Sequence, residues 1–172
     1  MEIKRMKKML IAYFSWSNGN TEGIARMLKA QTGSDLVRIE TAVPYSGSYD
    51  EVVEQGKAEV ERGFQPQIKP APVDVQAYDI IAVGTPTWWY TMAPAVLSFL
   101  RQQDWRGKTV VPFQTHAGWP GHVIQDIRAA CEGAAFGPAM EVKFDSDGGS
   151  RMETPVQEIG DWIIQVKNLL KS

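Results

Sequence analysis

The sequence has little of several features that define whole classes of protein. It contains one cysteine, Cys131, so no internal disulfide can form, and we expect a protein of the reducing cytoplasm. No apolar run is long enough to cross a bilayer, so we expect no membrane span. The formal net charge is only −2 over 172 residues, which argues against a surface for nucleic acid or anionic lipid. What is left is a globular chain, and we expect residues 1–172 to form a single domain.

Two common phosphate-binding loops are also missing. The sequence has no G-x-x-x-x-G-K-[ST] motif, so no lysine is placed to reach a triphosphate. It has no G-x-G-x-x-G motif, so the dinucleotide fingerprint is absent as well. Any phosphate site in this chain is therefore of another kind. Separately, we expect no metal site.

The segment from residue 9 to residue 31 has the pattern of a strand, a turn and a helix. Residues 9–14 are apolar enough for a buried strand, and Ile24, Met27 and Leu28 form an apolar stripe at helical spacing. Between them, residues 15–21 read SWSNGNT and consist mainly of hydroxyl and amide side chains. A helix N-terminus has unpaired N–H groups and a partial positive charge, which suits a phosphate. An ordinary helix-capping loop has the same composition, so the residues alone leave both readings open.

Strands and helices are expected to alternate along the whole chain. The expected strands are 9–14, 36–40, 79–84, 109–113 and 140–144. This alternation predicts an α/β fold with a parallel sheet covered on both faces. Ligands of such sheets bind beyond the carboxyl ends of the strands, where the unusual loops 15–21, 85–90 and 115–121 are expected to meet.

These three loops resemble those of the flavodoxin-like FMN-binding proteins. The SWSNGNT turn is similar to the phosphate loop of that family, GTPTWW at 84–89 to its second flavin loop, and FQTHAG at 113–118 to its third. The resemblance covers nearly the whole chain in order. It implies a flavodoxin-like, doubly wound five-stranded parallel sheet with strand order 2-1-3-4-5, helices on both faces, and FMN as the cofactor.

The resemblance also implies a set of cofactor-binding residues. The FMN phosphate would be held by Ser15, Ser17, Asn18, Gly19, Asn20 and Thr21. The ribityl chain and the ring would run beside Thr85, Pro86, Thr87, Trp88, Trp89 and Tyr90. The pyrimidine edge would be approached by Thr115, His116, Ala117 and Gly118, with Trp119 following them.

Several side chains in this set have two possible roles. His116 either donates a hydrogen bond to the flavin or points to solvent. We expect at least one of Trp88, Trp89 and Trp119 to touch the ring, although aromatic residues near buried strands are often plain core. No catalytic acid or base is required beyond FMN, and His116 and Tyr90 are the only candidates nearby.

The chain departs from the flavodoxin pattern in three ways. Its phosphate loop has one residue more than the common S-x-T-G-N-T form, its third loop lacks the acidic, tyrosine-bearing pattern of electron carriers, and its net charge is near neutral. Strong acidity steers carriers to basic partners, so its absence favours an enzyme.

Three functions follow as hypotheses. The first is an FMN-dependent oxidoreductase that passes electrons from reduced nicotinamide or another donor to a small acceptor such as a quinone. In it, loops 45–49 and 147–151 would shape an open face above the ring. The second is a flavodoxin-type electron carrier, and the third is a binding protein without turnover. Partners are expected to be small-molecule or protein redox donors and acceptors, and the chain a monomer or homodimer.

Overall fold

A parallel sheet forms the centre of the molecule in the computed structural model, which describes residues 5–146 and 149–172. Its strands are β1 (Met9–Tyr13), β2 (Asp35–Arg38), β3 (Ile80–Trp88) and β5 (Thr109–His116), and its last position is shared by β6 (Ala135–Phe136) and β7 (Met140–Lys143). The order is β2-β1-β3-β5-β6, and β7 also pairs with β5. The sequence predicted five strands, of which β5 is the fourth, and β6 and β7 together take the place of the fifth. In that numbering the observed order is 2-1-3-4-5, as expected. The flavodoxin-like fold is therefore confirmed.

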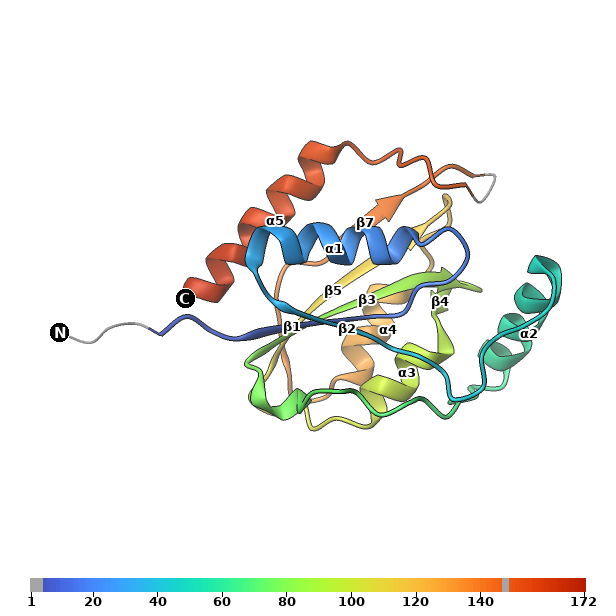
Figure 1. The fold of residues 1–172 in the computed structure, drawn as a ribbon, viewed down its shortest axis with the longest axis horizontal. Helices are drawn as coiled ribbons and strands as arrows, with labels where there is room; N and C mark the ends of the chain where they lie inside the picture. Colours follow the sequence, from blue (N-terminus) through green and yellow to red (C-terminus); the bar gives the residue numbers. More distant parts are fainter. Residues whose placement is uncertain (1–4, 147–148) are drawn as a thin grey trace.

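Four helices cover the two faces of this sheet. Helices α1 (Asn20–Thr32) and α5 (Val156–Lys171) lie over one face, and α3 (Pro94–Arg101) and α4 (Val123–Ala130) over the other (Figure 1). Alternate residues of β1 enter two separate cores, Ile11 toward α1 and α5 and Leu10 toward α3 and α4. Both faces of the strands are thus buried, which explains their continuous apolar runs.

The helix α2 (Tyr49–Glu61) has a different place. It stands beyond the carboxyl ends of the strands instead of lying against a face of the sheet (Figure 1). It begins at Ser48, whose side chain accepts a hydrogen bond from the backbone N–H of Glu51. This position makes α2 one wall of the region where the loops of the sheet converge.

The structure corrects the expected ends of two strands. The segment 85–90, expected as a loop, continues β3 to Trp88 and then turns into the short antiparallel strand β4 (Thr91–Met92). Pro86 fits within β3 because pairing with β1 ends at Gly84, so at Pro86 the strand has β5 as its only parallel neighbour. The strand β5 likewise extends to His116, three residues beyond its expected end at Phe113.

The edge of the sheet beyond β5 is interrupted, where the sequence predicted one strand over 140–144. Ala135 and Phe136 pair with the start of β5, and Met140–Lys143 pair with its end. Gly137 and Pro138 lie between the two pieces, and the N–H of Gly137 still donates to Val110. Proline cannot complete a ladder, so the strand is divided there.

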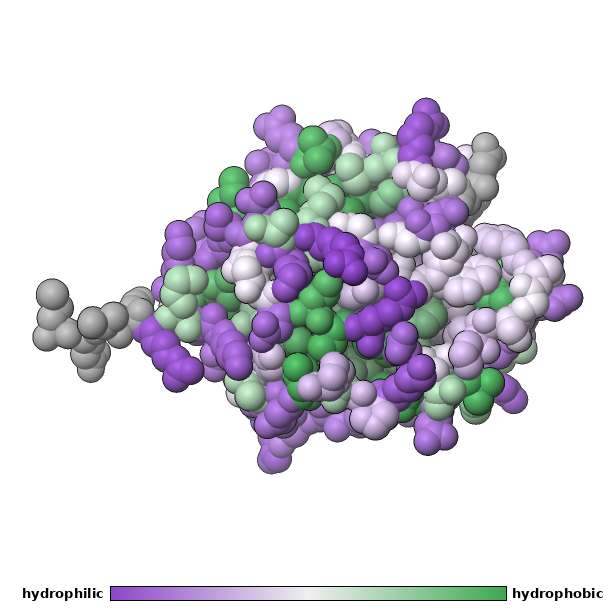
Figure 2. All heavy atoms as spheres, in the orientation of Figure 1, coloured by the Kyte–Doolittle hydropathy of each residue, from purple (hydrophilic) through white to green (hydrophobic). Residues whose placement is uncertain are grey.

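The large apolar side chains exposed on the described surface come from several different elements and loops, among them Val43, Trp119, Val156 and Ile164. On the face shown in Figure 2, hydrophilic residues surround small separate patches of hydrophobic ones. Within residues 5–146 and 149–172, no helix has the length and apolar character needed to cross a membrane.

Candidate functional site

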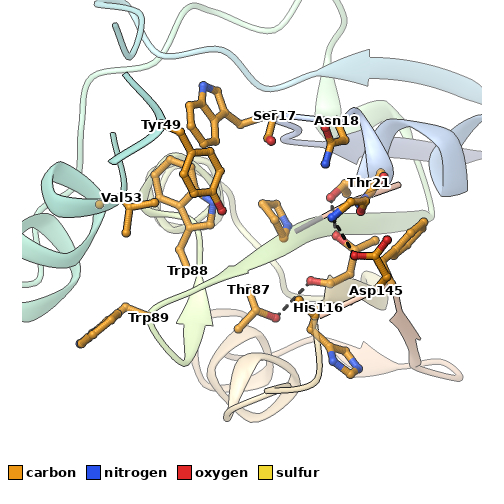
Figure 3. A pocket seen from close by; sticks show the side chains of 18 of the residues that line it. Ser17, Asn18, Thr21, Tyr49, Val53, Thr87, Trp88, Trp89, His116 and Asp145 are labelled. Carbon is orange, nitrogen blue, oxygen red and sulfur yellow. Dashed lines mark hydrogen bonds between the residues drawn. The ribbon is translucent and has the colours of Figure 1, made fainter. Parts of the chain in front are cut away.

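A cavity of about 280 Å³ lies at the carboxyl ends of β1, β3 and β5, with α2 on its far side (Figure 3). All three loops singled out in the sequence contribute to its lining. The expected site residues that line it are Ser17, Asn18, Asn20, Thr21, Pro86, Thr87, Trp88, Trp89, Thr115, His116 and Ala117. The structure therefore brings together most of the residues that the motifs selected.

Three expected residues lie outside this lining and support it from behind. Ser15 is buried, and its hydroxyl accepts a hydrogen bond of 3.2 Å from the N–H of Glu22 in the first turn of α1. Gly19 is the N-cap of α1 and has the positive φ of 73° that the turn requires. Thr85 is fully buried, and its hydroxyl accepts from the N–H of Ala93 at 3.0 Å. These three residues shape the loops instead of facing the cavity.

Three further expected residues also do not line the cavity. Tyr90 and Trp119 are exposed at the surface, at 52% and 63% of their full area. Gly118 directs its N–H to the ring nitrogen Nδ1 of His116 at 3.0 Å. Of the three tryptophans considered for ring contact, Trp88 and Trp89 face the cavity and Trp119 does not.

The hydroxyl-rich end of the cavity is built around the start of α1. Ser17 and Gly19 both have positive φ, at 65° and 73°, which turns the chain sharply into the helix. The hydroxyl of Thr21 is buried and hydrogen-bonded to the hydroxyl of Thr115 at 2.8 Å, so the first and third loops are joined. Asn20 donates to the carbonyl of Gly149 at 3.1 Å. An anion here would meet hydroxyl groups and the positive end of a helix dipole.

The opposite wall of the cavity is aromatic. Trp88 packs edge-on against Phe14, Trp16 and Tyr45, with ring centroids 5.0–6.1 Å apart. Trp16 in turn stacks on Tyr49 of α2 at 5.5 Å. Trp88 thus belongs to a packed cluster and lines the cavity as well, while Trp16 is both a packing and a lining residue.

A buried carboxylate anchors this aromatic wall to α2. Glu59 is 3% exposed and accepts hydrogen bonds from the hydroxyl of Tyr45 at 2.7 Å and the amide of Gln55 at 2.9 Å. Burial and the hydrogen bond to Glu59 raise the pKa of Tyr45 well above its ordinary value. Tyr45 therefore stays protonated and holds the loop before α2 in place.

The turn between β3 and β4 is strained. Trp88 pairs with Thr91, which leaves Trp89 and Tyr90 as a two-residue turn with φ of 50° and 71°. Such hairpin turns favour Asn-Gly, and bulky residues at these angles cost about 1–3 kcal/mol each. The backbone N–H of His122 donates to the carbonyl of Tyr90 at 2.8 Å. The Thr91 hydroxyl also donates to Asp126 at 2.5 Å, so the start of α4 fixes the hairpin.

His116 is held as a neutral imidazole. Its Nδ1 accepts the Gly118 N–H, which leaves the ring proton on Nε2. Burial lowers its pKa, with smaller and opposing effects from Glu141, which raises it, and Lys143, which lowers it. His116 can therefore donate one hydrogen bond from Nε2 but does not bring a positive charge to the cavity at neutral pH.

The sequence interpretation missed most of the wall that α2 supplies. Tyr49, Val53, Gly56 and Lys57 face the cavity, at the spacing of a single helix face. Gly56 could have indicated this wall from the sequence, because a glycine within a helix often marks a close approach to another segment. In the structure, a Cβ at Gly56 would lie 2.9 Å from the Trp88 ring. Phe144, Asp145 and Gly149 complete the lining.

Part of the loop expected above the ring can be placed. Of residues 147–151, Gly149 lines the cavity, and its N–H donates to Asp145 at 3.1 Å. Asp147 and Gly148 lie outside the described residues. In the part of the chain that the structure describes, no group of three His, Cys, Asp or Glu residues is arranged to hold a metal ion.

This chain is similar to flavodoxins in sequence and to solved flavoproteins in fold. The family model described as Flavodoxin matches residues 8–159. Flavodoxin 1 of Escherichia coli is 28% identical over 105 residues, which are 59% of this chain and 46% of that protein. The chain thus spans about half the length of the curated relatives it matches.

Solved structures show the same fold. A flavoprotein from Lactobacillus acidophilus in complex with FMN superposes with a TM-score of 0.69 at 23% identity, over 78% of this chain and 93% of that chain. A proposed flavoprotein from Bacteroides eggerthii superposes with a TM-score of 0.75 at 24% identity, over 96% of this chain and 99% of that chain. At sequence identities of 23% and 24%, these superpositions show that the proteins share a fold.

Proposed function

Because this chain belongs to the flavodoxin family of FMN-binding proteins, we propose that it is an FMN-dependent oxidoreductase. In this proposal it passes electrons from reduced nicotinamide or another donor to a small acceptor such as a quinone. One observation carries the proposal: a single cavity joins a hydroxyl-rich helix N-terminus to an aromatic wall. FMN has matching ends, a phosphate and a flat ring.

The residues of the cavity fit this cofactor. Ser17, Asn18 and Thr21 surround the start of α1 and would hold the phosphate through hydroxyl, amide and backbone N–H groups. Trp88 offers its ring to the isoalloxazine. Hydroxyl, amide and backbone N–H groups can hold a phosphate without a cationic side chain. This agrees with the loop 15–21, which contains no lysine or arginine.

The chemistry of electron transfer would come from FMN, which takes up and releases two electrons. The chain would supply binding, orientation and electrostatics. The Nε2–H of His116 would donate a hydrogen bond to a flavin oxygen and stabilise charge that develops there on reduction. The hydrogen bond between Thr21 and Thr115 would hold the first and third loops together at the phosphate end of the site. The aromatic wall and α2 would exclude water from one side of the ring.

Two observations favour an enzyme over an electron carrier. The net charge of −2 gives little electrostatic steering toward a basic protein partner. The helix α2 and the hairpin at Trp89 also border the cavity, which suits a small acceptor better than a broad protein surface. The carrier remains the second candidate, since the curated relatives are flavodoxins.

The proposal is tested with purified protein loaded with FMN and freed of excess cofactor by dialysis. We expect a retained flavin absorption band at one FMN per chain, followed by NADH or NADPH oxidation when a quinone is added. A protein that binds FMN but is reduced only by a separate reductase would instead be a carrier. A protein that neither retains FMN nor quenches its fluorescence would contradict the whole proposal.

The Thr21→Val variant is expected to weaken FMN binding about tenfold. It removes one hydroxyl from the phosphate end, and a hydrogen bond to a charged group contributes about 1.5–3 kcal/mol. Riboflavin lacks the phosphate, so its dissociation constant should change less than twofold. Fluorescence titration with both flavins measures the difference. Thr32→Val, at the other end of α1, is the matched control, and an equal loss for both flavins would show that Thr21 acts through the fold.

A further inference from the structure

We propose that Lys57 and Trp89 form a subsite at the mouth of the cavity for a planar aromatic acceptor that carries a negative charge. In this subsite the acceptor ring stacks on Trp89 and its anionic group pairs with Lys57. The inference rests on the proposed function, because it names the acceptor class of the same site.

The position of Trp89 is the first observation. Its side chain lines the cavity yet remains 45% exposed, so part of the indole is accessible. The ammonium of Lys57 lies 4.6 Å from the centroid of this ring. Trp89 is on the opposite side of the cavity from Asn18 and Thr21 (Figure 3). A phosphate held at those residues would be far from Lys57, so Lys57 is left for another anion.

The turn that carries Trp89 is the second observation. Asn-Gly would form a two-residue turn of this kind without strain, but the chain uses Trp89 and Tyr90 at positive φ. The strained turn is fixed to α4 through the N–H of His122 and the carbonyl of Tyr90. Strain that the surrounding structure maintains is typical of ligand-contacting segments. The exposed part of the Trp89 indole gives a planar ligand a surface on which to stack.

The charges around the cavity are the third observation. The described lining contains three side chains that can be charged near neutral pH: Lys57, His116 and Asp145. His116 is held neutral, and Asp145 lies across the cavity from Trp89 (Figure 3). Lys57 is therefore the cation of the described lining, and it stands beside an aromatic face. A cation next to a stacking surface selects flat anions over flat neutral molecules.

A quinone bound at this subsite would be reduced by two electrons. The quinone would take up two electrons and two protons and become the hydroquinone, and FMN bound in its reduced form would supply both. Negative charge develops on the quinone oxygens during the transfer. In this proposal Lys57, beside the Trp89 ring, would stabilise that charge in addition to pairing with a fixed anionic substituent.

Binding of an unreactive pair of ligands tests the subsite without turnover. The oxidised, FMN-loaded protein is titrated by calorimetry with anthraquinone-2-sulfonate and with the neutral 2-(hydroxymethyl)anthraquinone. We expect Lys57→Met to weaken sulfonate binding about three- to tenfold and neutral binding less than twofold. Trp89→Asn, which suits the turn, should weaken both ligands. Lys8→Met is the matched control, because Lys8 also lies over an aromatic ring, 4.5 Å from the centroid of Tyr78, at the other end of the sheet.

Reoxidation of the reduced protein separates this inference from the proposed function. The protein is reduced chemically and mixed with naphthoquinone-2-sulfonate or with menadione in a stopped-flow instrument. Reoxidation by neither quinone would refute the proposed function. If both quinones reoxidise the protein, the quantity to compare is the ratio of the rate with the sulfonate to the rate with menadione. The same ratio in Lys57→Met and in the unmodified protein would refute only the Lys57 subsite. A Lys57→Met variant that weakens FMN but not riboflavin would also refute it, because Lys57 would then be a partner of the phosphate.

Discussion

Replacing Gly84 with alanine is expected to lower the free energy of unfolding by about 3 kcal/mol. Gly84 lies in the middle of the sheet and pairs with Tyr13 on one side and Phe113 on the other. A Cβ at this position would stand 2.2 Å from Cζ and 2.3 Å from Cε2 of the Phe113 ring. That ring is fully buried and packs against Trp162, with centroids 5.6 Å apart, so it has little space to move away.

Thermal and urea unfolding measure this loss. For a chain of this length we expect the midpoint of thermal unfolding to fall by about 6–12 °C. Gly160→Ala is the matched control, because a Cβ there meets no atom within 4 Å and alanine favours the helix α5 by about 1 kcal/mol.

A second substitution tests the cause of the loss. Phe113→Leu shortens the side chain that the new Cβ would meet, so it should restore part of the stability of Gly84→Ala. In the unmodified background, the same change should cost about 1 kcal/mol. Additive effects of the two substitutions, or a loss below 1 kcal/mol for Gly84→Ala alone, would show that the core adjusts around the added methyl group.

The sequence carried enough information for the sheet and for the convergence of the three loops at one edge of it. Buried parallel strands must be apolar on both faces, so runs such as 79–84 were distinct, and strand order followed from the resemblance of the loops. The hydroxyl-rich turn at 15–21 has the composition of an ordinary helix-capping loop as well, so its reading as a phosphate loop came from the resemblance of all three loops together.

The parts that could not be predicted depend on contacts between segments far apart in the chain. The amphipathic pattern of 49–62 predicts a helix but does not say that α2 stands over the strand ends and not on a sheet face. The end of β3 at Trp88 depends on pairing with β4, and Trp89-Tyr90 has none of the residues that normally indicate a tight turn. Gly56 is the residue whose type points to one of these contacts, because a glycine within a helix often marks a close approach.

Gly121→Ala is expected to cost about 3 kcal/mol and to weaken FMN binding about tenfold. A Cβ at this position would lie 2.1 Å from the carbonyl oxygen and 2.6 Å from the Cα of Tyr90, so it would meet backbone atoms. The hairpin would have to move away, which breaks the 2.8 Å hydrogen bond from His122 to Tyr90. Since Trp88 and Trp89 line the cavity on the same hairpin, the ring side of the FMN site would shift with it.

The backbone angle of Gly121 must be separated from this contact. Gly121 has a φ of 57°, which alone disfavours alanine by about 1 kcal/mol. Gly107 has a φ of 78°, and a Cβ there would meet no atom within 4 Å. Gly107→Ala therefore has the cost of an alanine at positive φ without a steric clash like that between Gly121 and Tyr90. The difference between the two variants, measured by urea unfolding, is the energy that fixes the hairpin to α4. If Gly121→Ala costs no more than Gly107→Ala and binds FMN normally, the hairpin is not fixed, and the strained turn at Trp89 loses its structural explanation.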